Sequence, residues 1–301
     1  MNRFVIFDGN ATLHRAYHAL PPLTTKAHEP INAVYGMMSM LLKILQDFRP
    51  SHISFAFDTK EPTFRNKLSE EYQAQRAEVD TDLISQFEKA RTTLTAFHIP
   101  FFEKPGYEAD DVIGTIVTQL ETDPYFDEII VVTGDRDLLQ LVTNKIFLYM
   151  PNGLNNGKLM KAEDTKTKMG VYPDKIVEYK ALVGDPSDNY KGVAGIGPKT
   201  AIKLIEEFGT VENIFSKSDE IPVKLREKLV NGQTSAHLSK KLATIVRDVP
   251  LPEFHLDDCA LWKLDSSEGI ALFEEYGFKT LTKRMQDTAK LFIAKNQLSL
   301  L

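Results

Sequence analysis

Residues 4–9 read FVIFDG, an uninterrupted apolar run that leads into Asp8 and Gly9. A continuous apolar run without polar alternation is typical of a strand that is buried on both faces of a sheet. Three further short strand patterns lie at residues 52–57, 128–133 and 145–150. The sequence therefore predicts a sheet that is covered by helices on both sides.

Segments with helical periodicity fill the intervals between these strands. They lie at residues 33–48, 83–97 and 110–120. Strands that alternate with helices indicate an α/β fold with a mainly parallel central sheet flanked by helices. We place this core at residues 1–172. A helical region is predicted from residue 173 to residue 301, with helices at 173–183, 199–208, 223–230, 235–247 and 267–276.

The composition is that of a soluble globular protein, with 43% hydrophobic and 26% charged residues among 301. No stretch approaches the ~20 apolar residues of a membrane helix. The first residues have neither a basic leader nor a small-residue cleavage site, so we expect no signal peptide. Cys259 is the single cysteine, which excludes an internal disulfide and fits a cytoplasmic protein.

The net charge of −6 argues against a simple electrostatic binder of nucleic acid, which would usually be basic. Nine of the carboxylates are assigned below to metal sites. Without them, 33 acids face 36 bases in the rest of the chain. Bound divalent cations would neutralise the nine acids themselves.

Acidic residues follow three of the four predicted strands. Asp8 ends the first, Asp58 ends the second, and Asp135 and Asp137 follow the third after Gly134. Ligands of open α/β sheets bind beyond the carboxyl ends of the strands. Any one of these aspartates alone is better explained as a turn or cap residue. Three sites together, two of them beside a glycine, favour a common binding site.

Two further acidic motifs are not explained by the local effects of a helix end on charged residues. Glu108, Asp110 and Asp111 crowd the first turn of a predicted helix, where the helix dipole explains one acid more easily than three. Asp185 and Asp188 follow the end of a helix, where acids oppose the dipole.

The donor set indicates the chemistry. A set of oxygen ligands selects hard divalent cations such as Mg²⁺ or Mn²⁺. The sequence contains no Cys/His cluster of the kind that binds zinc. Two such cations can activate a water and stabilise a leaving oxygen. The residues alone therefore predict metal-dependent phosphodiester hydrolysis.

A glycine-rich segment, GVAGIGPKTA, follows Asp188 at residues 192–201. Backbone N–H groups beside glycines at a helix start can approach a phosphate closely. We predict a helix-hairpin-helix element at about residues 174–208 that grips the DNA backbone. An ordinary glycine-rich turn is the alternative. The predicted DNA contacts are Gly192, Gly195, Gly197, Lys199 and Thr200.

Taken together, residues 8–283 resemble the 5′ nuclease domain of bacterial DNA polymerase I, a member of the flap endonuclease superfamily. The segments that carry the resemblance are FDGN (7–10), HRAYHALP (14–21), FDTKEPTFR (57–65), GYEADD (106–111), TGDRDLLQLV (133–142), GDPSDN (184–189) and LATI (242–245). Nothing after about residue 285 resembles a polymerase, so a free-standing nuclease and an excised domain both stay open.

The resemblance implies a role for each acid. The first metal cluster would comprise Asp8, Asp58, Glu108, Asp110 and Asp111, with Asp135 bridging to the second. The second cluster would comprise Asp137, Asp185 and Asp188. Members of the family cleave 5′ flaps and 5′ ends, and their hairpin often holds a monovalent ion such as K⁺. The resemblance implies a monomer that acts on branched or nicked DNA, with a DNA polymerase as a candidate partner.

The resemblance also implies a helical arch at about residues 61–95, and the arch motif departs from its relatives. Where they read YKxxR, this chain reads YQAQR at residues 72–76, so Gln73 replaces a lysine. Tyr72 and Arg76 would share one helix face and contact DNA, unless that face is merely solvated. Loss of the lysine would lower the cleavage rate by roughly 10²–10³-fold, unless the positive charge of Arg65 or Lys67 compensates.

Three functions therefore compete. The first is a structure-selective 5′ nuclease in which Tyr72, Arg76 and Arg65 assist catalysis. The second is a protein that binds branched DNA with little activity. The third is a related nuclease that cleaves RNA. The full set of acids favours the first over the second, and the hairpin favours DNA over RNA.

Overall fold

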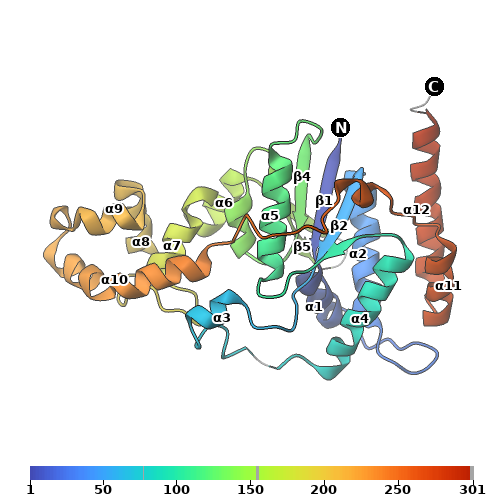
Figure 1. The fold of residues 1–301 in the computed structure, drawn as a ribbon, viewed down its shortest axis with the longest axis horizontal. Coiled ribbons are helices and arrows are strands. Elements are labelled where there is room, and N and C mark those ends of the chain that lie inside the picture. The colour runs from blue at the N-terminus through green and yellow to red at the C-terminus, as the bar shows by residue number, and fades with distance from the viewer. Residues whose placement is uncertain (77, 154–155, 299–301) are drawn as a thin grey trace.

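The computed structural model describes residues 1–76, 78–153 and 156–298, and its centre is a six-stranded sheet (Figure 1). The strand order is β3-β2-β1-β4-β5-β6. The first five strands are parallel, and β6 pairs with β5 in the antiparallel sense. The strands are β1 (Arg3–Asp8), β2 (His52–Ala56), β3 (Phe101–Phe102), β4 (Glu128–Val132), β5 (Ile146–Asn152) and β6 (Asn156–Met160). The predicted α/β fold is confirmed.

Helices cover both faces of the sheet, which explains the unbroken apolar run of β1. Phe4 and Ile6 point into a core beneath α5 (Ala109–Glu121). Val5 and Phe7 point into a second core on the opposite face. The helices of that second core are α1 (Gly9–Ala19), α2 (Asn32–Phe48), α4 (Thr81–Ala96), α11 (Ser267–Tyr276) and α12 (Lys279–Leu298).

Residues 162–243, and not the whole second half of the chain, form a helical lobe at one end of the molecule (Figure 1). Its elements are α6 (Ala162–Met169), η2 (Pro173–Lys175), α7 (Ile176–Val183), α8 (Pro198–Phe208), α9 (Val211–Ser216), η3 (Ser218–Glu220) and α10 (Val223–Ala243). After α10 the chain crosses back over α5 to η4 (Leu256–Ala260), α11 and α12.

One prediction in this lobe is wrong. The helices expected at 223–230 and 235–247 are one continuous helix, α10. Gly232 does not break this helix, and its role is in packing. A Cβ at this position would lie 2.6 Å from Val193 Cγ1, so the glycine allows Val193 to pack directly against the helix. The helix ends at Ala243, and the N–H group of Val246 donates instead to Asp111 at 2.9 Å.

The expected arch is also not a continuous helix. Residues 64–68 form the short helix α3 (Phe64–Leu68), residues 70–75 form turns, and α4 begins at Thr81. Gln73 adopts a left-handed backbone with φ 55°. Tyr72 and Arg76 therefore do not share a helix face. Among the described residues, no helix combines the length and apolar character that a membrane span requires.

Candidate active site

An open pocket of about 680 Å³ lies at the carboxyl edge of the sheet. The strand register creates it, because Asp8 pairs with Ala56 of β2 and Phe7 pairs with Val132 of β4. The loops after β2 and β4 therefore emerge on either side of Asp8. The predicted acids that line this pocket are Asp8, Asp58, Glu108, Asp110 and Asp135.

Neutral donors orient several of these carboxylates. Asp8 accepts hydrogen bonds from the Ala11 N–H group at 2.9 Å and from Thr133 Oγ1 at 2.8 Å. Thr133 Oγ1 in turn accepts from the Asp135 N–H group at 2.9 Å. Asp58 accepts from the N–H group of Ala109, at the start of α5, at 2.7 Å. These contacts fix the acids in position without neutralising their charge.

The electrostatics of this first cluster favour a bound cation. Burial raises the pKa of Asp8 to about 7, with Asp58 and Asp135 adding to the shift. Burial likewise raises the pKa of Glu108 to about 7. The pKa of Asp110 is raised well above its ordinary value by burial and by the negative charges of Asp135 and Asp8. Crowded carboxylates of this kind bind protons or cations to relieve their repulsion.

A second acidic cluster lies beside the first. Carboxylate oxygens of Asp137, Asp185 and Asp188 all lie within 4.8 Å of one another. Asp137 starts the 3-10 helix η1 (Asp137–Leu141), and the other two lie in the turn after α7. The N–H group of Asp137 donates to Asp135 Oδ1 at 2.8 Å, which joins the two clusters. This oxygen-only set fits a hard divalent cation.

Lys180 is a residue of this site that sequence reasoning missed. It projects from α7, is 5% exposed, and contacts Asp137 while its Nζ lies 2.5 Å from Asp185 Oδ2. Burial raises the pKa of Asp137 to about 6, although Lys180 opposes this shift. Burial acts in the same direction on Asp185, but Lys180 and the hydrogen bonds from Ser187 together outweigh it and lower that pKa. In the sequence, nothing distinguishes Lys180 from the other lysines of the predicted helices.

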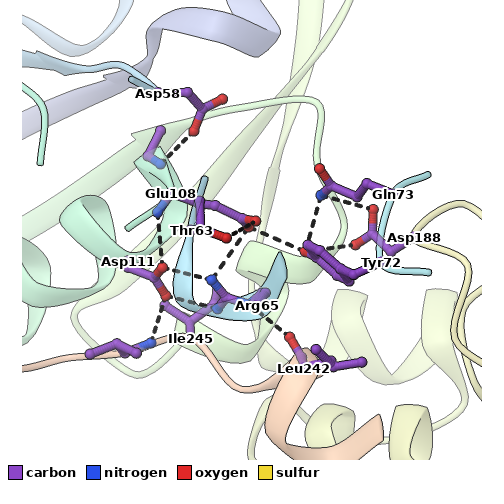
Figure 2. Close-up of polar contacts among 12 residues, drawn as sticks. Asp58, Thr63, Arg65, Tyr72, Gln73, Glu108, Asp111, Asp188, Leu242 and Ile245 are labelled. Carbon is purple, nitrogen blue, oxygen red and sulfur yellow. Dashed lines mark hydrogen bonds and ion pairs between the residues drawn. The ribbon is translucent and has the colours of Figure 1, made fainter. Parts of the chain in front are cut away.

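The segment that contains Gln73 contacts Asp188 of the second cluster (Figure 2). The Tyr72 hydroxyl lies 3.2 Å from Glu108 Oε2 and 3.4 Å from Asp188 Oδ2, and so connects the clusters. Gln73 Nε2 donates to Asp188 at 3.2 Å and to Tyr72 Oη at 3.0 Å. Arg76 donates to Asp188 Oδ1 at 2.8 Å while its side chain stays 56% exposed.

The larger pocket also contains basic side chains. Arg76 and Lys60 line its wall. His14 lies there too, and burial together with His18 and Arg76 lowers its pKa, so its ring is neutral near pH 7. Lys60 and His14 belong to motifs quoted above for the family resemblance, but the pocket they share is visible only in three dimensions.

Two predicted site residues, Arg65 and Asp111, pair with each other and do not line the large pocket, which corrects their expected roles. Arg65 is 2% exposed, and its guanidinium forms a two-pronged pair with Asp111 at 2.7 and 2.8 Å (Figure 2). Its Nε and Nη2 groups donate to the carbonyl groups of Leu242 and Thr244 at 2.9 and 2.8 Å. Nη1 also lies 3.4 Å from Glu108 Oε2, so all three nitrogens face acceptors of the protein. The pair fastens α3 and the end of α10 to the start of α5.

The glycine-rich hairpin separates the predicted DNA contacts into two groups. Gly192 is buried with φ 60°, and a Cβ there would lie 2.4 Å from the Gly184 nitrogen. A glycine is required at position 192 for this close packing. Because Gly192 is buried, it cannot contact DNA as predicted. Gly195, Gly197 and Lys199 are exposed, and Thr200 is half-buried at the start of α8. Lys228 of α10 donates to the Gly195 carbonyl at 3.1 Å and adds a cation beside the hairpin.

Carboxylate clusters at the carboxyl edge of a parallel sheet, with a glycine-rich hairpin beside them, define a class of divalent-cation-dependent enzymes that act on phosphate esters. Residues 3–170 match the N-terminal resolvase-like domain of 5′-3′ exonucleases, and residues 171–267 match their C-terminal SAM fold. The chain belongs to the 5′-3′ exonuclease family.

Curated relatives agree with this membership. DNA polymerase I of Caldicellulosiruptor bescii is 41% identical over 286 residues, which are 94% of this chain and 33% of that protein. DNA polymerase I of Bacillus subtilis is 38% identical over 291 residues, 96% of this chain and 33% of that protein. The chain therefore spans about a third of the length of these relatives.

Solved structures share the fold. The T5 5′-exonuclease with bound divalent metal ions (zinc) superposes with a TM-score of 0.66 at 21% identity, covering 97% of this chain and 100% of that one. Flap endonuclease-1 from Methanococcus jannaschii superposes with a TM-score of 0.60 at 17% identity, covering 97% and 93% of the two chains. The fold expected from the sequence resemblance is thus confirmed.

The neighbouring residues Asp110 and Asp111 should respond oppositely to neutralisation. Asp111→Asn removes the nearer of the two carboxylates that pair with the buried Arg65 charge, and we expect the free energy of unfolding to fall by about 3–5 kcal/mol. Asp110→Asn removes a repelling charge, so stability should be unchanged or higher while Mn²⁺ binding weakens. Urea unfolding and Mn²⁺ titration measure the two effects. Full stability of Asp111→Asn would contradict the assigned pair.

The first cluster should make the stability of the cation-free protein depend on pH. Asp8 and Glu108 have folded-state pKa values of about 7 and unfolded values near 4, so the folded state binds more protons between these limits. Their contribution is complete at low pH and is lost as the pH rises through about 7. We expect Tm in EDTA to fall over this window and Mg²⁺ to reverse the fall. A Tm that rises in EDTA would contradict this.

Proposed function

We propose that the chain is a structure-selective 5′ nuclease that hydrolyses phosphodiester bonds at 5′ ends and 5′ flaps of branched DNA. The observation that carries the proposal is the pair of adjoining carboxylate clusters at the carboxyl edge of the sheet. Membership of the 5′-3′ exonuclease family supports the same reaction. The alternative of a DNA-binding protein without activity gives no reason to bury so many repelling acids.

The residues divide the work as follows. Asp8, Asp58, Glu108 and Asp110 would hold one divalent cation, Mg²⁺ or Mn²⁺, with Asp135 between the clusters. Asp137, Asp185 and Asp188 would hold another. When bound, such cations supply an activated water and offset charge on the leaving oxygen. Asp111 contributes indirectly, because its pair with Arg65 positions the start of α5.

Basic side chains and the exposed hairpin would hold the DNA. Arg76 and Lys60 line the pocket and suit contacts with the phosphates next to the cleaved bond. The exposed hairpin, with Gly195, Gly197 and Lys199, suits the backbone of a duplex, with K⁺ as a candidate ion on its carbonyl groups. A structural neighbour, the catalytic core of Rad2, is described in complex with a DNA substrate. Its TM-score is 0.60.

The setting is part of the proposal. Because the chain corresponds to about a third of each matched DNA polymerase I, a polymerase is the partner expected to extend the strand behind the nuclease. We propose a monomer that acts on DNA in the cytoplasm.

The primary test is cleavage of a 5′-flap DNA labelled separately at each end, with Mg²⁺ or Mn²⁺. We expect cleavage near the branch and short products from the 5′ end, each abolished by EDTA. Asp135→Asn should lose at least about 10²-fold in rate, because it sits between the clusters. Retention of flap binding in Ca²⁺ with no cleavage in either metal would favour the binding-protein alternative, and preference for an RNA flap would favour the RNA nuclease.

The uncharged side chain of Gln73 is expected to limit the rate of DNA cleavage. Its amide lies on Asp188 and Tyr72 but carries no charge toward a phosphate. We expect Gln73→Lys to raise the single-turnover cleavage rate by about 10-fold or more, because a cation there stabilises charge on the phosphate. Gln75→Lys, two residues along the same segment, is the matched control and should have little effect. Equal rates for wild type and Gln73→Lys would refute this account of the position.

A further inference from the structure

The second cluster already holds a cation supplied by the chain itself. The ammonium group of Lys180 contacts Asp137 and Asp185, two of the three acids proposed as ligands of a divalent cation. It also lies in a buried position, since Lys180 is 5% exposed. A divalent cation bound to both carboxylates would have to take over contacts that the ammonium makes. Two cations cannot share these oxygens without strong repulsion at such short range.

A buried hydroxyl lies beside this cluster with no assigned partner. Tyr190 is 6% exposed, and its hydroxyl oxygen is buried without a hydrogen-bond partner among the described residues. The backbone of Tyr190 exchanges two hydrogen bonds with Asp185, at 2.8 and 3.1 Å, and its ring stacks on Tyr72 at 6.5 Å between centroids. A buried hydroxyl without a partner is costly, which indicates that it has one in another state of the site.

These backbone hydrogen bonds place Tyr190 beside Asp185, one of the two acids that Lys180 contacts. Burial raises the pKa of Tyr190, and the charge that acts on it most is that of Lys180, followed by Asp137 and Asp185. The ammonium group has three donors, and two of them are used by Asp137 and Asp185. Lys180 and Tyr190 both contact Asp185, so a spare donor and a spare acceptor belong to two buried residues that share one neighbour.

We propose that Lys180 is an internal counter-ion that a divalent cation displaces from the second cluster, and that Tyr190 is the positioning residue that receives the displaced ammonium. The inference rests on the proposed cation site at Asp137, Asp185 and Asp188. Displacement moves the ammonium from the two carboxylates to the phenol oxygen, to which it donates a hydrogen bond. Lys180 thereby holds the acids together before the cation arrives, and Tyr190 keeps its charge solvated afterwards.

The proposal makes opposite demands on the two side chains. Without the ammonium, a divalent cation meets no competitor, so Lys180→Met should bind Mn²⁺ at the second cluster about 10-fold more tightly. Without the phenol oxygen, the displaced ammonium has no acceptor, so Tyr190→Phe should bind about 5-fold more weakly. In Lys180→Met there is no ammonium to receive, so adding Tyr190→Phe should change nothing. Such non-additivity is expected only of residues that act on each other.

The experiment is a Mn²⁺ titration of the full chain at fixed pH, followed by electron paramagnetic resonance of free Mn²⁺. Asp185→Asn identifies which class of bound ions belongs to the second cluster. Tyr172→Phe is the matched control, because its exposed hydroxyl donates to Glu163 at 3.1 Å, outside the site. Tyr190→Phe keeps the ring and its stacking on Tyr72, and circular dichroism verifies folding. Lys180→Gln replaces Lys180→Met if the latter fails to fold.

The outcomes separate this inference from the proposed function. Tighter binding in Lys180→Met, weaker binding in Tyr190→Phe and no further effect in the double variant support the exchange. Additive effects, or unchanged binding in Tyr190→Phe, overturn it and leave the nuclease proposal intact. Failure of wild type to bind Mn²⁺ at either cluster overturns both.

Discussion

Repulsion among the carboxylates at the carboxyl edge of the sheet is the constraint on which the rest of the structure depends. Asp8, Asp110 and Asp135 lie in one pocket because three parallel strands end there and α5 begins there. Burial and mutual repulsion make each charge costly, as the raised pKa of Asp8 and Asp110 indicates. The fold holds these groups together through its buried strands, and the energy stored in their repulsion is what a divalent cation would release on binding.

The basic side chains around the acidic clusters have different roles. Arg65 is buried and paired with Asp111, and it joins α3, α5 and the end of α10 into one unit. Lys180 neutralises part of the second cluster from within the helical lobe. Arg76 and Lys60 stay at the pocket wall, where a phosphate could reach them. The contrast follows from burial, because a cation whose donors are all bonded inside the protein cannot also bind DNA.

The helical lobe is coupled to the acidic pocket through few but specific contacts. The turn that carries Asp185 and Asp188 leads directly into the hairpin, and Gly184 and Gly192 pack against each other at its base. A duplex held at the hairpin would therefore lie at a fixed distance from the second cluster. Tyr72 adds a second connection, since its hydroxyl lies between Glu108 and Asp188.

The sequence by itself determined the parallel sheet, the strand ends that carry acids, and the family. Buried strands leave continuous apolar runs, and Asp8, Asp58 and Asp135 follow such runs at the one edge where parallel strands converge. Local pattern failed where long-range contacts override propensity. Val193 packs on Gly232 within a continuous α10, and Asp111 draws the backbone at Val246 out of the helix.

Only the tertiary structure decided which charges serve the site. Arg65, Arg76 and Lys180 look alike as basic residues in a sequence, yet one is locked to Asp111, one faces the pocket, and one lies inside the second cluster. Their partners Asp111, Asp188 and Asp137 are 46, 112 and 43 residues away along the chain. Burial and pairing over such separations are properties of the packed chain, so no local pattern of residues encodes them.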